Sequence, residues 1–248
     1  MIKLTDHDVP LGTLVSPAPG VWMAPSFAGA GLVHGFGERS LAVEQLVERL
    51  GAGAAAVIRL EQVHGSAIAE ITQRPRVLED VLAGDDGAIT DQPNVALTIR
   101  TADCAPVGFY DPAHRAIGAA HVGWRGLAAT LPQRMVEAMH RRWGTQPGAL
   151  RIVMGPMIGA CCYEVGLEFV SRFPAWVRQE HGRRTLNLRA GIAAQLRAVG
   201  VHAGKIADSG ICTACHPARC HSYRREGAAA GRCHFALALI ASGVRGRD

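Results

Sequence analysis

Short apolar runs, broken by glycine and proline, are the main feature of the hydrophobic pattern along the chain. Runs of this length between turn residues favour β-strands over helices. The predicted strands lie in residues 31–40, 54–65, 84–104, 105–120, 149–166, 204–217 and 228–242. Two of these strands are predicted to end at a chemically useful side chain, His64 in one case and Cys104 in the other.

Three other segments have apolar residues at the spacing of an amphipathic helix, in residues 41–51, 131–144 and 185–201. Gly51 and Gly144 are expected to end the first two, and Thr130 to serve as the N-cap of the second. Helices and strands alternate, but several consecutive strands have no helix between them. We therefore predict the α+β class, with one mixed domain over residues 1–248.

A predicted hairpin brings two reactive side chains together. The runs APVGFY and RAIGAA are separated by DPAH, whose Asp and Pro favour a tight turn. If the hairpin is centred between Pro112 and Ala113, Cys104 lies directly opposite His121, with Cβ atoms roughly 5 Å apart. A thiolate and an imidazole at this separation can share a metal ion or act as a nucleophile and its base. A buried cysteine beside a core histidine is an equally simple interpretation.

His64 adds a third candidate ligand, because it also comes at the end of a strand and before a glycine. Two histidines and one cysteine leave the fourth tetrahedral position open, as in catalytic zinc sites. Arg125 follows in HVGWRG, where a cation and the backbone N–H groups of a loop favour an anion such as phosphate. Asp103 is placed either to orient a ligand or accept a proton, or to cap a turn.

Composition and charge limit the possible partners. No apolar run is long enough to span a membrane, and the first twenty residues do not have the pattern of a signal peptide. The net charge of +5 comes from scattered arginines, and aromatic residues make up 5% of the chain. We therefore expect no membrane and no nucleic-acid partner. The missing signal peptide predicts a cytoplasmic location, where thiols stay reduced, so the seven cysteines, an odd number, favour reactive or metal-binding roles over a disulfide framework.

Several longer motifs resemble one known family. They are TADCAPV, HVGWRG, GPMIGACCYEVG and CTACHPARCHSYRREGAAAGR, with EQVHG upstream, and the similarity runs from about residue 30 to the C-terminus. They are similar to the YfiH family, whose members have been called multicopper polyphenol oxidases or laccase-like proteins and were later assigned purine nucleoside phosphorylase activity.

The resemblance implies a zinc ion on His64, Cys104 and His121. It implies phosphorolysis of adenosine, inosine and methylthioadenosine to a ribose 1-phosphate and the free base, together with deamination of adenosine. The implied fold is an α+β sandwich, similar to the cysteine hydrolase domain of the cytotoxic necrotizing factor. A monomer or weak homodimer is expected.

Phosphorolysis requires a phosphate held against a sugar carbon that develops positive charge. Arg125 is the first candidate to bind it, followed by Arg39 and Arg100. The chain departs from the family pattern beside Arg39, within FGERS, which weakens that assignment. It also departs before SYRR, where Cys220 and His221 replace an aromatic pair.

The second departure leaves two interpretations open. Either a surface loop carries incidental thiols, which we favour, or a second metal binds among Cys212, Cys215, Cys220 and His221. Cys161 and Cys162 are expected to pack where the chain enters a helix.

Three alternatives to a zinc enzyme also remain. Two histidines and a cysteine form a blue-copper ligand set, so a copper-dependent polyphenol oxidase is possible, although none of the 11 histidines lies two residues from another. Cys104 as nucleophile with His121 as base would make a cysteine hydrolase. The third alternative is a binding protein in which the metal site is purely structural. A structural zinc ion, however, would have a ligand in the fourth coordination position, which is open here.

Overall fold

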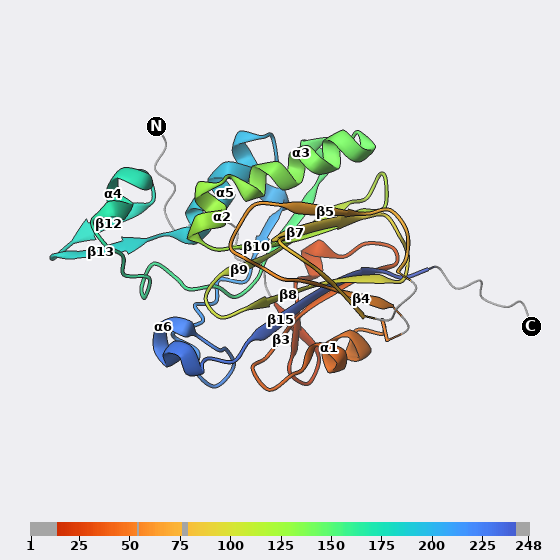
Figure 1. Ribbon diagram of the computed structural model, residues 1–248, viewed down its shortest axis with the longest axis horizontal. Coiled ribbons are helices and arrows are strands. Elements are labelled where there is room, and N and C mark those ends of the chain that lie inside the picture. The colour runs from red at the N-terminus through yellow and green to blue at the C-terminus, as the bar shows by residue number, and fades with distance from the viewer. Residues whose placement is uncertain (1–13, 54, 76–78, 242–248) are drawn as a thin grey trace, which may run out of the picture.

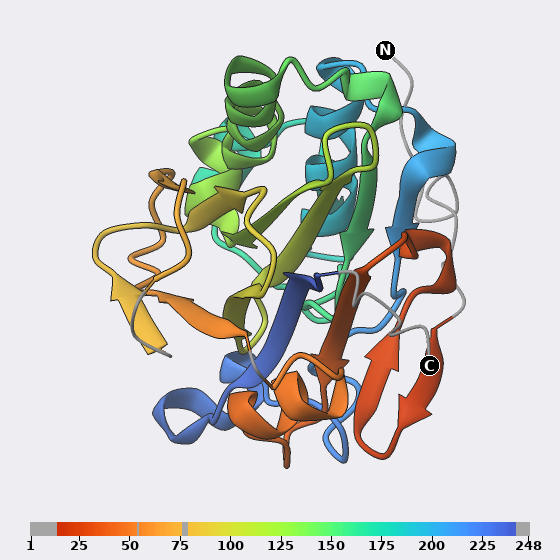
Figure 2. The ribbon, with the colours of Figure 1, turned by 90° about the vertical axis from the view of Figure 1, so that its right-hand side faces the viewer.

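Two β-sheets lie face to face through the middle of the molecule, and helices cover the outer face of each (Figure 1). The computed structural model describes residues 14–53, 55–75 and 79–241. Figure 2 shows the strand β15 (Cys233–Leu239), in dark blue, beside β3 (Leu32–Gly37), in red-brown. The first and last parts of the described chain therefore meet in one sheet.

Among the described residues, one sheet has seven strands. Their spatial order is β1 (Val15–Ala18), β2 (Val21–Met23), β3, β15, β8 (Val95–Thr101), β4 (Ala56–Leu60) and β6 (Glu79–Leu82). The strand β4 runs parallel to β8 and β6, and the other pairs are antiparallel.

The other large sheet has six strands within the described ranges. Their order is β14 (Ile206–Asp208), β11 (Arg151–Met154), β9 (Ala105–Asp111), β10 (Ala116–Val122), β7 (Gly87–Thr90) and β5 (Ile68–Ile71). Parallel pairs lie at its two edges, β14 with β11 and β7 with β5. A separate hairpin consists of β12 (Val177–Glu180) and β13 (Arg183–Leu186).

Helices α2, α3 and α5 lie on the outer face of the six-stranded sheet, and α1 lies on that of the seven-stranded sheet (Figure 1). The α-helices are α1 (Val43–Arg49), α2 (Trp124–Ala128), α3 (Leu131–Trp143), α4 (Glu168–Arg172), α5 (Leu188–Ala198) and α6 (Tyr223–Glu226). Single 3₁₀ turns occur at Pro25–Phe27, Pro147–Ala149, Ala203–Lys205 and Gly227–Ala229. No helix among the described residues is long and apolar enough to cross a membrane.

Apolar side chains fill the space between the layers. Between the sheets, Phe36 and Phe235 stack with their ring centroids 4.7 Å apart, in one buried cluster that also contains Ile117 from β10. Met135 of α3 and Leu46 of α1 are fully buried in the two outer layers. Each such side chain stabilises the fold by roughly 1.5–3 kcal/mol through removal of apolar surface from water.

The predicted hairpin forms from β9 and β10, but its register differs from the expected one. His121 pairs with Pro106, and the same register continued places Gly123 opposite Cys104. Asp111 pairs with Ala116, so the turn shifts by one residue to 112–115, and the carboxylate of Asp111 caps it by accepting hydrogen bonds from the backbone N–H groups of Ala113 (2.8 Å) and His114 (3.3 Å). Each strand residue has a partner two positions away from the predicted one. Because side chains alternate between the two faces of a sheet with a period of two, Cys104 and His121 remain on the predicted face.

Some boundaries also differ from the predicted ones. The strand β4 ends at Leu60, four residues before His64, and β8 ends at Thr101, before Cys104. Cys161 and Cys162 lie in a turn and not at the entry to a helix, which corrects that expectation. Thr130 occupies the N-cap position of α3 but makes no side-chain capping bond. The three predicted helices and the closing strand are confirmed.

Candidate metal centre and substrate pocket

The site lies at one end of the sandwich, where the chain passes from one sheet to the other. The strand β8 ends in the seven-stranded sheet, and β9 begins in the six-stranded sheet only four residues later. Asp103 and Cys104 lie in this connection, and Asp103 has a φ of 92°, a value that few residues other than glycine adopt. Both carboxylate oxygens of Asp103 are bonded, one to Thr213 Oγ1 (2.5 Å) and one to the backbone N–H of Arg224 (2.7 Å). These bonds hold the connection that presents Cys104.

A buried aspartate organises the two histidines. The Oδ1 atom of Asp86 lies 2.8 Å from Nδ1 of His121, which leaves Nε2 of that ring for a ligand. The same carboxylate accepts the backbone N–H groups of His64 (3.1 Å) and Gly65 (2.6 Å). Asp86 is fully buried, and it fixes both the ring of His121 and the loop that carries His64. A carboxylate behind a ligating histidine is typical of metal sites.

His64, Cys104 and His121 meet as a three-donor group. Their nitrogen and sulfur atoms lie within 4.8 Å of one another, and this group is one of two clusters in the described residues that could hold a metal ion. The two imidazole rings are 4.8 Å apart in an edge-to-face arrangement. A Cβ atom at Gly123 would lie 2.8 Å from the sulfur of Cys104, so glycine is required there for the thiol to keep its place.

Hydrogen bonds set the ionisation of this group. Burial raises the pKa of the Cys104 thiol, but hydrogen bonds with His121 and His64 outweigh it and lower the pKa to about 7. Burial lowers the pKa of His121, but its hydrogen bonds with Asp86 and Cys104 outweigh burial and raise that pKa to about 9. Burial also raises the pKa of Asp86, and the hydrogen bond to His121 brings it below its usual range. At a pH between the pKa values of Cys104 and His121, the metal-free protein therefore holds a thiolate beside an imidazolium.

This ionisation predicts how the metal-free protein reacts. We expect the rate of Cys104 alkylation by iodoacetamide to reach half its maximum near pH 7, because only the thiolate reacts and it predominates above its pKa. Mass spectrometry of the Cys104 peptide across a pH series measures the midpoint. In the His121→Ala variant the midpoint should rise. A wild-type midpoint near the ordinary thiol value of about 8.5 would contradict the hydrogen bonding described for this site.

The three donors lie in the wall of a pocket of about 770 Å³. Its cationic lining comes from Arg100, Arg125, Arg224 and Arg232. Its aromatic lining comes from Trp124, Tyr163 and Tyr223, and Tyr223 is 58% exposed. Among the described residues that line the pocket, Asp103 is the only one with a carboxylate, so the pocket is suited to an anionic ligand with a flat apolar part.

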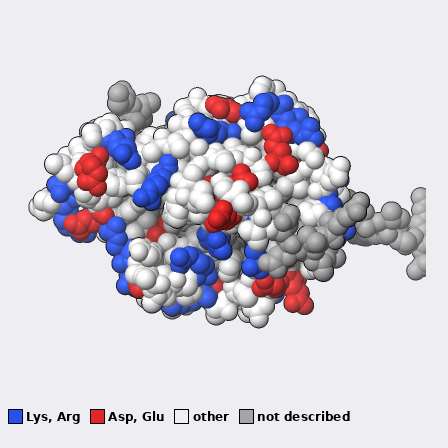
Figure 3. Space-filling model, in the orientation of Figure 1, with Lys and Arg blue, Asp and Glu red and all other residues white. Residues whose placement is uncertain are grey.

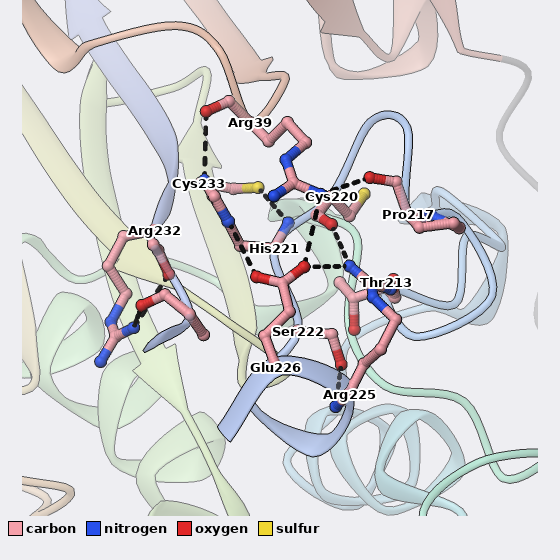
Figure 4. Close-up of polar contacts among 12 residues, drawn as sticks. Arg39, Thr213, Pro217, Cys220, His221, Ser222, Arg225, Glu226, Arg232 and Cys233 are labelled. Atoms are coloured by element: carbon pink, nitrogen blue, oxygen red, sulfur yellow. Dashed lines mark hydrogen bonds and ion pairs between the residues drawn. The ribbon is translucent and has the colours of Figure 1, made fainter. Parts of the chain in front are cut away.

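The structure brings most of the predicted site residues together. Cys104, His121, His64, Asp103, Arg100 and Arg125 all line the pocket. Arg39 does not belong to this lining. Its guanidinium bonds to the carbonyl oxygen of Pro217 (2.5 Å) and pairs with Glu226 (3.3 Å) (Figure 4).

Sequence reasoning missed Asp86 and most of the pocket wall. The register of β7 with β10 pairs Gly87 with Ala120, which puts Asp86 beside His121. Without that pairing, Asp86 could only be interpreted as part of a turn. Trp124, Tyr163 and Arg224 occur in the motifs that carried the family resemblance, which was the available signal for them.

Comparison with known proteins identifies the family. Residues 24–240 match the family described as multi-copper polyphenol oxidoreductase laccase. The chain belongs to this family. The match includes the three-donor group and the residues of the pocket wall, and the expected resemblance is confirmed.

Relatives in this family carry the names of nucleoside enzymes. A purine nucleoside phosphorylase of Deinococcus radiodurans is 36% identical over 200 residues, covering 79% of this chain and 75% of the relative. Purine nucleoside phosphorylase YlmD of Geobacillus stearothermophilus is 34% identical over 187 residues, covering 69% and 68%. Adenosine deaminase RL5, from an unknown prokaryotic organism, is 30% identical over 229 residues, covering 84% and 86%.

Solved structures confirm the fold. The crystal structure of YlmD from Geobacillus stearothermophilus superposes with a TM-score of 0.84 at 28% identity, covering 94% of this chain and all of that one. A Bacillus licheniformis protein titled YfiH gives a TM-score of 0.84 at 25% identity, with coverages of 91% and 98%. The predicted mixed α+β fold of the YfiH type is therefore correct.

Proposed function

We propose that this protein is a zinc-dependent purine nucleoside phosphorylase that also deaminates adenosine. One observation carries the proposal: a three-donor group of two histidines and one cysteine lies in the wall of an arginine-lined pocket. The relatives named purine nucleoside phosphorylase and adenosine deaminase support it.

The donor chemistry fits zinc. Imidazole nitrogen and thiolate sulfur are usual Zn²⁺ ligands, and three protein donors leave the fourth position open to the pocket. The contact between Asp86 and Nδ1 of His121 orients the ring as a metal ligand requires. When bound, a zinc ion supplies Lewis-acid chemistry and lowers the pKa of a coordinated water to about 7.

The pocket residues would bind the other reactants. Arg125 and Arg100 are placed to bind phosphate, since a guanidinium can bond two phosphate oxygens at once. The exposed ring of Tyr223 offers a flat surface for the purine base. Asp103 acts as a positioning residue, because both its oxygens are already bonded to the pocket wall. Phosphate held against the ribose would then attack as the glycosidic bond breaks.

Product analysis tests this function. Adenosine and inosine are incubated with the purified protein, with and without phosphate, and the products are separated by chromatography. We expect ribose 1-phosphate and the free base only when phosphate is present, and inosine from adenosine in either condition. If neither nucleoside is consumed, the proposed function is wrong.

Arg125 provides a sharper test of phosphate binding. The Arg125→Ala variant should raise the KM for phosphate by about 10- to 100-fold, because a charge-assisted hydrogen bond contributes roughly 1.5–3 kcal/mol. Arg172→Ala is the matched control. Both guanidinium groups lie over the ring of Trp124, at 4.6 Å and 5.0 Å, but Arg172 does not line the pocket. Equal effects of the two substitutions on the phosphate KM would exclude a specific role for Arg125.

A cysteine hydrolase is the second candidate, and one observation favours it. Cys104, His121 and Asp86 are linked by hydrogen bonds in the order of a nucleophile, a base and an orienting carboxylate. A copper-dependent polyphenol oxidase is the third, because the same donors suit copper and the family description names one. Chelation followed by addition of zinc or copper separates these candidates: the hydrolase needs no metal, and the oxidase consumes oxygen only with copper.

We also propose a cytoplasmic protein that acts as a monomer or weak homodimer, with purine nucleosides and phosphate as its partners. All seven cysteines are free, which fits a reducing compartment. Figure 3 shows acidic side chains between the basic ones on the face that it draws, in place of a continuous basic surface. We therefore expect no nucleic-acid partner.

A further inference from the structure

Four cysteines form a second cluster outside the three-donor group. The sulfur atoms of Cys161, Cys162, Cys212 and Cys215 all lie within 4.8 Å of one another. Cys162 and Cys215 are 3.4 Å apart, and Cys161 and Cys215 are 3.7 Å apart. In the sequence these thiols belong to two segments about 50 residues apart, CCYEVG and CTACH, so only the fold brings them together.

Two tight turns present the four thiols. Around the first pair, the backbone N–H groups of Cys162 and Tyr163 both donate to the carbonyl oxygen of Gly159 (3.0 and 2.9 Å). Around the second pair, the backbone N–H of Cys215 donates to the carbonyl oxygen of Cys212 (3.2 Å). Met157 bonds to the second segment through both its backbone groups, which fixes the two turns side by side.

The spacing of the sulfur atoms matches a metal centre better than a disulfide. A tetrahedral ion with Zn–S bonds of about 2.3 Å separates its sulfur ligands by about 3.8 Å. A disulfide requires a distance of about 2.05 Å, far below the distances here. The backbone N–H of Gly159 also donates to the sulfur of Cys212 (3.2 Å), as expected beside a thiolate ligand. A Cβ atom at Gly159 would lie 3.2 Å from the sulfur of Cys161, so a glycine suits this crowded position.

We propose that Cys161, Cys162, Cys212 and Cys215 bind a structural zinc ion. Four thiolates complete a tetrahedron and leave no open position, which is typical of structural and not of catalytic zinc. Binding releases the thiol protons to solvent and involves no change of oxidation state. This second site is independent of the proposed function, because it shares no ligand with the three-donor group.

The ion would hold part of the pocket wall in place. Residues beside both pairs of ligands bond to Asp103: the backbone N–H of Ile158, three residues before Cys161, donates to the carbonyl oxygen (2.9 Å), and Thr213 Oγ1 donates to the side chain (2.5 Å). Tyr163, which lines the pocket, follows Cys162 directly. Arg225 donates to the carbonyl oxygens of Thr213 and Ala214 (both 2.9 Å), so a cation lies close to the charge of the thiolates.

This ligand set differs from the one considered from the sequence. Cys212 and Cys215 belong to it, but Cys220 and His221 do not. The ring of His221 contacts Glu226 and the carbonyl oxygen of Arg39, both at 3.2 Å (Figure 4). Cys220 is buried and lies in contact with Cys233. The loop before SYRR is therefore packed against its own neighbours.

Metal counting by elemental analysis and native mass spectrometry tests the second site. We expect about two zinc ions per chain in the wild type, one in Cys215→Ser, one in Cys104→Ala and none in the double variant. Cys215 is exposed, so its replacement by serine leaves the buried core unchanged. Cys220→Ala is the matched control and should keep both ions, since it removes a thiol outside both clusters.

Thiol reactivity gives a second measurement on the unmodified chain. Cys161 and Cys215 are exposed, yet as zinc ligands they should not react with a thiol reagent until a chelator removes the ion. The proposal is overturned if the wild type and Cys215→Ser hold the same amount of zinc, or if the exposed thiols react at once. It is also overturned if peptide mapping of the unreduced chain finds a disulfide between two of these four cysteines. None of these outcomes depends on nucleoside turnover.

Discussion

Replacing Cys104 with alanine should remove the metal from the three-donor group and abolish nucleoside phosphorolysis. The thiolate is one of the three donors that form this group among the described residues, and the two histidines alone leave half the tetrahedron empty. The loss should exceed the roughly 10- to 100-fold effect that removing an outer partner of a metal ligand usually has. Metal content and initial rates with inosine and phosphate, measured on the same preparation, check this.

The matched control is again Cys220→Ala, which should retain both metal and rate. Chelation of the wild type separates a ligand from a nucleophile. If Cys104 binds zinc, activity is lost with the metal and returns when zinc is added. If activity survives complete removal of the metal, Cys104 acts as a nucleophile and the zinc proposal is wrong.

The Asp86→Asn variant should bind zinc about 10- to 100-fold more weakly than the wild type. The carboxylate of Asp86 contacts three groups, the ring of His121 and the backbone N–H groups of His64 and Gly65. An amide of the same size has a single acceptor oxygen, so at least one of these contacts is lost in a fully buried position. Titration against a chromophoric chelator measures the affinity.

Asp85→Asn is the control for this substitution, since it changes the neighbouring carboxylate, which has no direct contact with His121. It should leave zinc affinity unchanged. An Asp86→Asn protein that binds zinc as tightly as the wild type would show that His121 is oriented by its packing alone. Circular dichroism confirms that both variants are folded before the titration.

Local signals in the sequence were sufficient for many individual elements. Helix α3 follows the predicted apolar spacing and ends at Gly144, whose φ of 74° is one that glycine adopts readily. The strands β9 and β10 follow from two apolar runs around an Asp-Pro turn. Such elements could be predicted because their causes lie within a few residues of the chain.

Contacts between distant segments could not be predicted in this way. The hairpin turn lies one residue further along the chain than predicted, because Asp111 still belongs to β9 and its carboxylate caps the turn that follows. The position of Asp86 beside His121 depends on the pairing of β7 with β10, since the two residues are 35 positions apart in the chain. Arg39, expected near the phosphate, instead pairs with Glu226 in a segment far along the chain.

The grouping of His64, Cys104 and His121 and the family could be predicted from the sequence, because the motifs around these residues are local and specific. The fold was needed to find the other side chains around them: the aspartate behind His121, Arg224 and Arg232 in the pocket wall, and the grouping of Cys161 and Cys162 with Cys212 and Cys215. The physical reason is that these neighbours come from strands and turns far apart in the chain. Their contacts depend on sheet pairing and on packing between layers, which no short pattern of residues records.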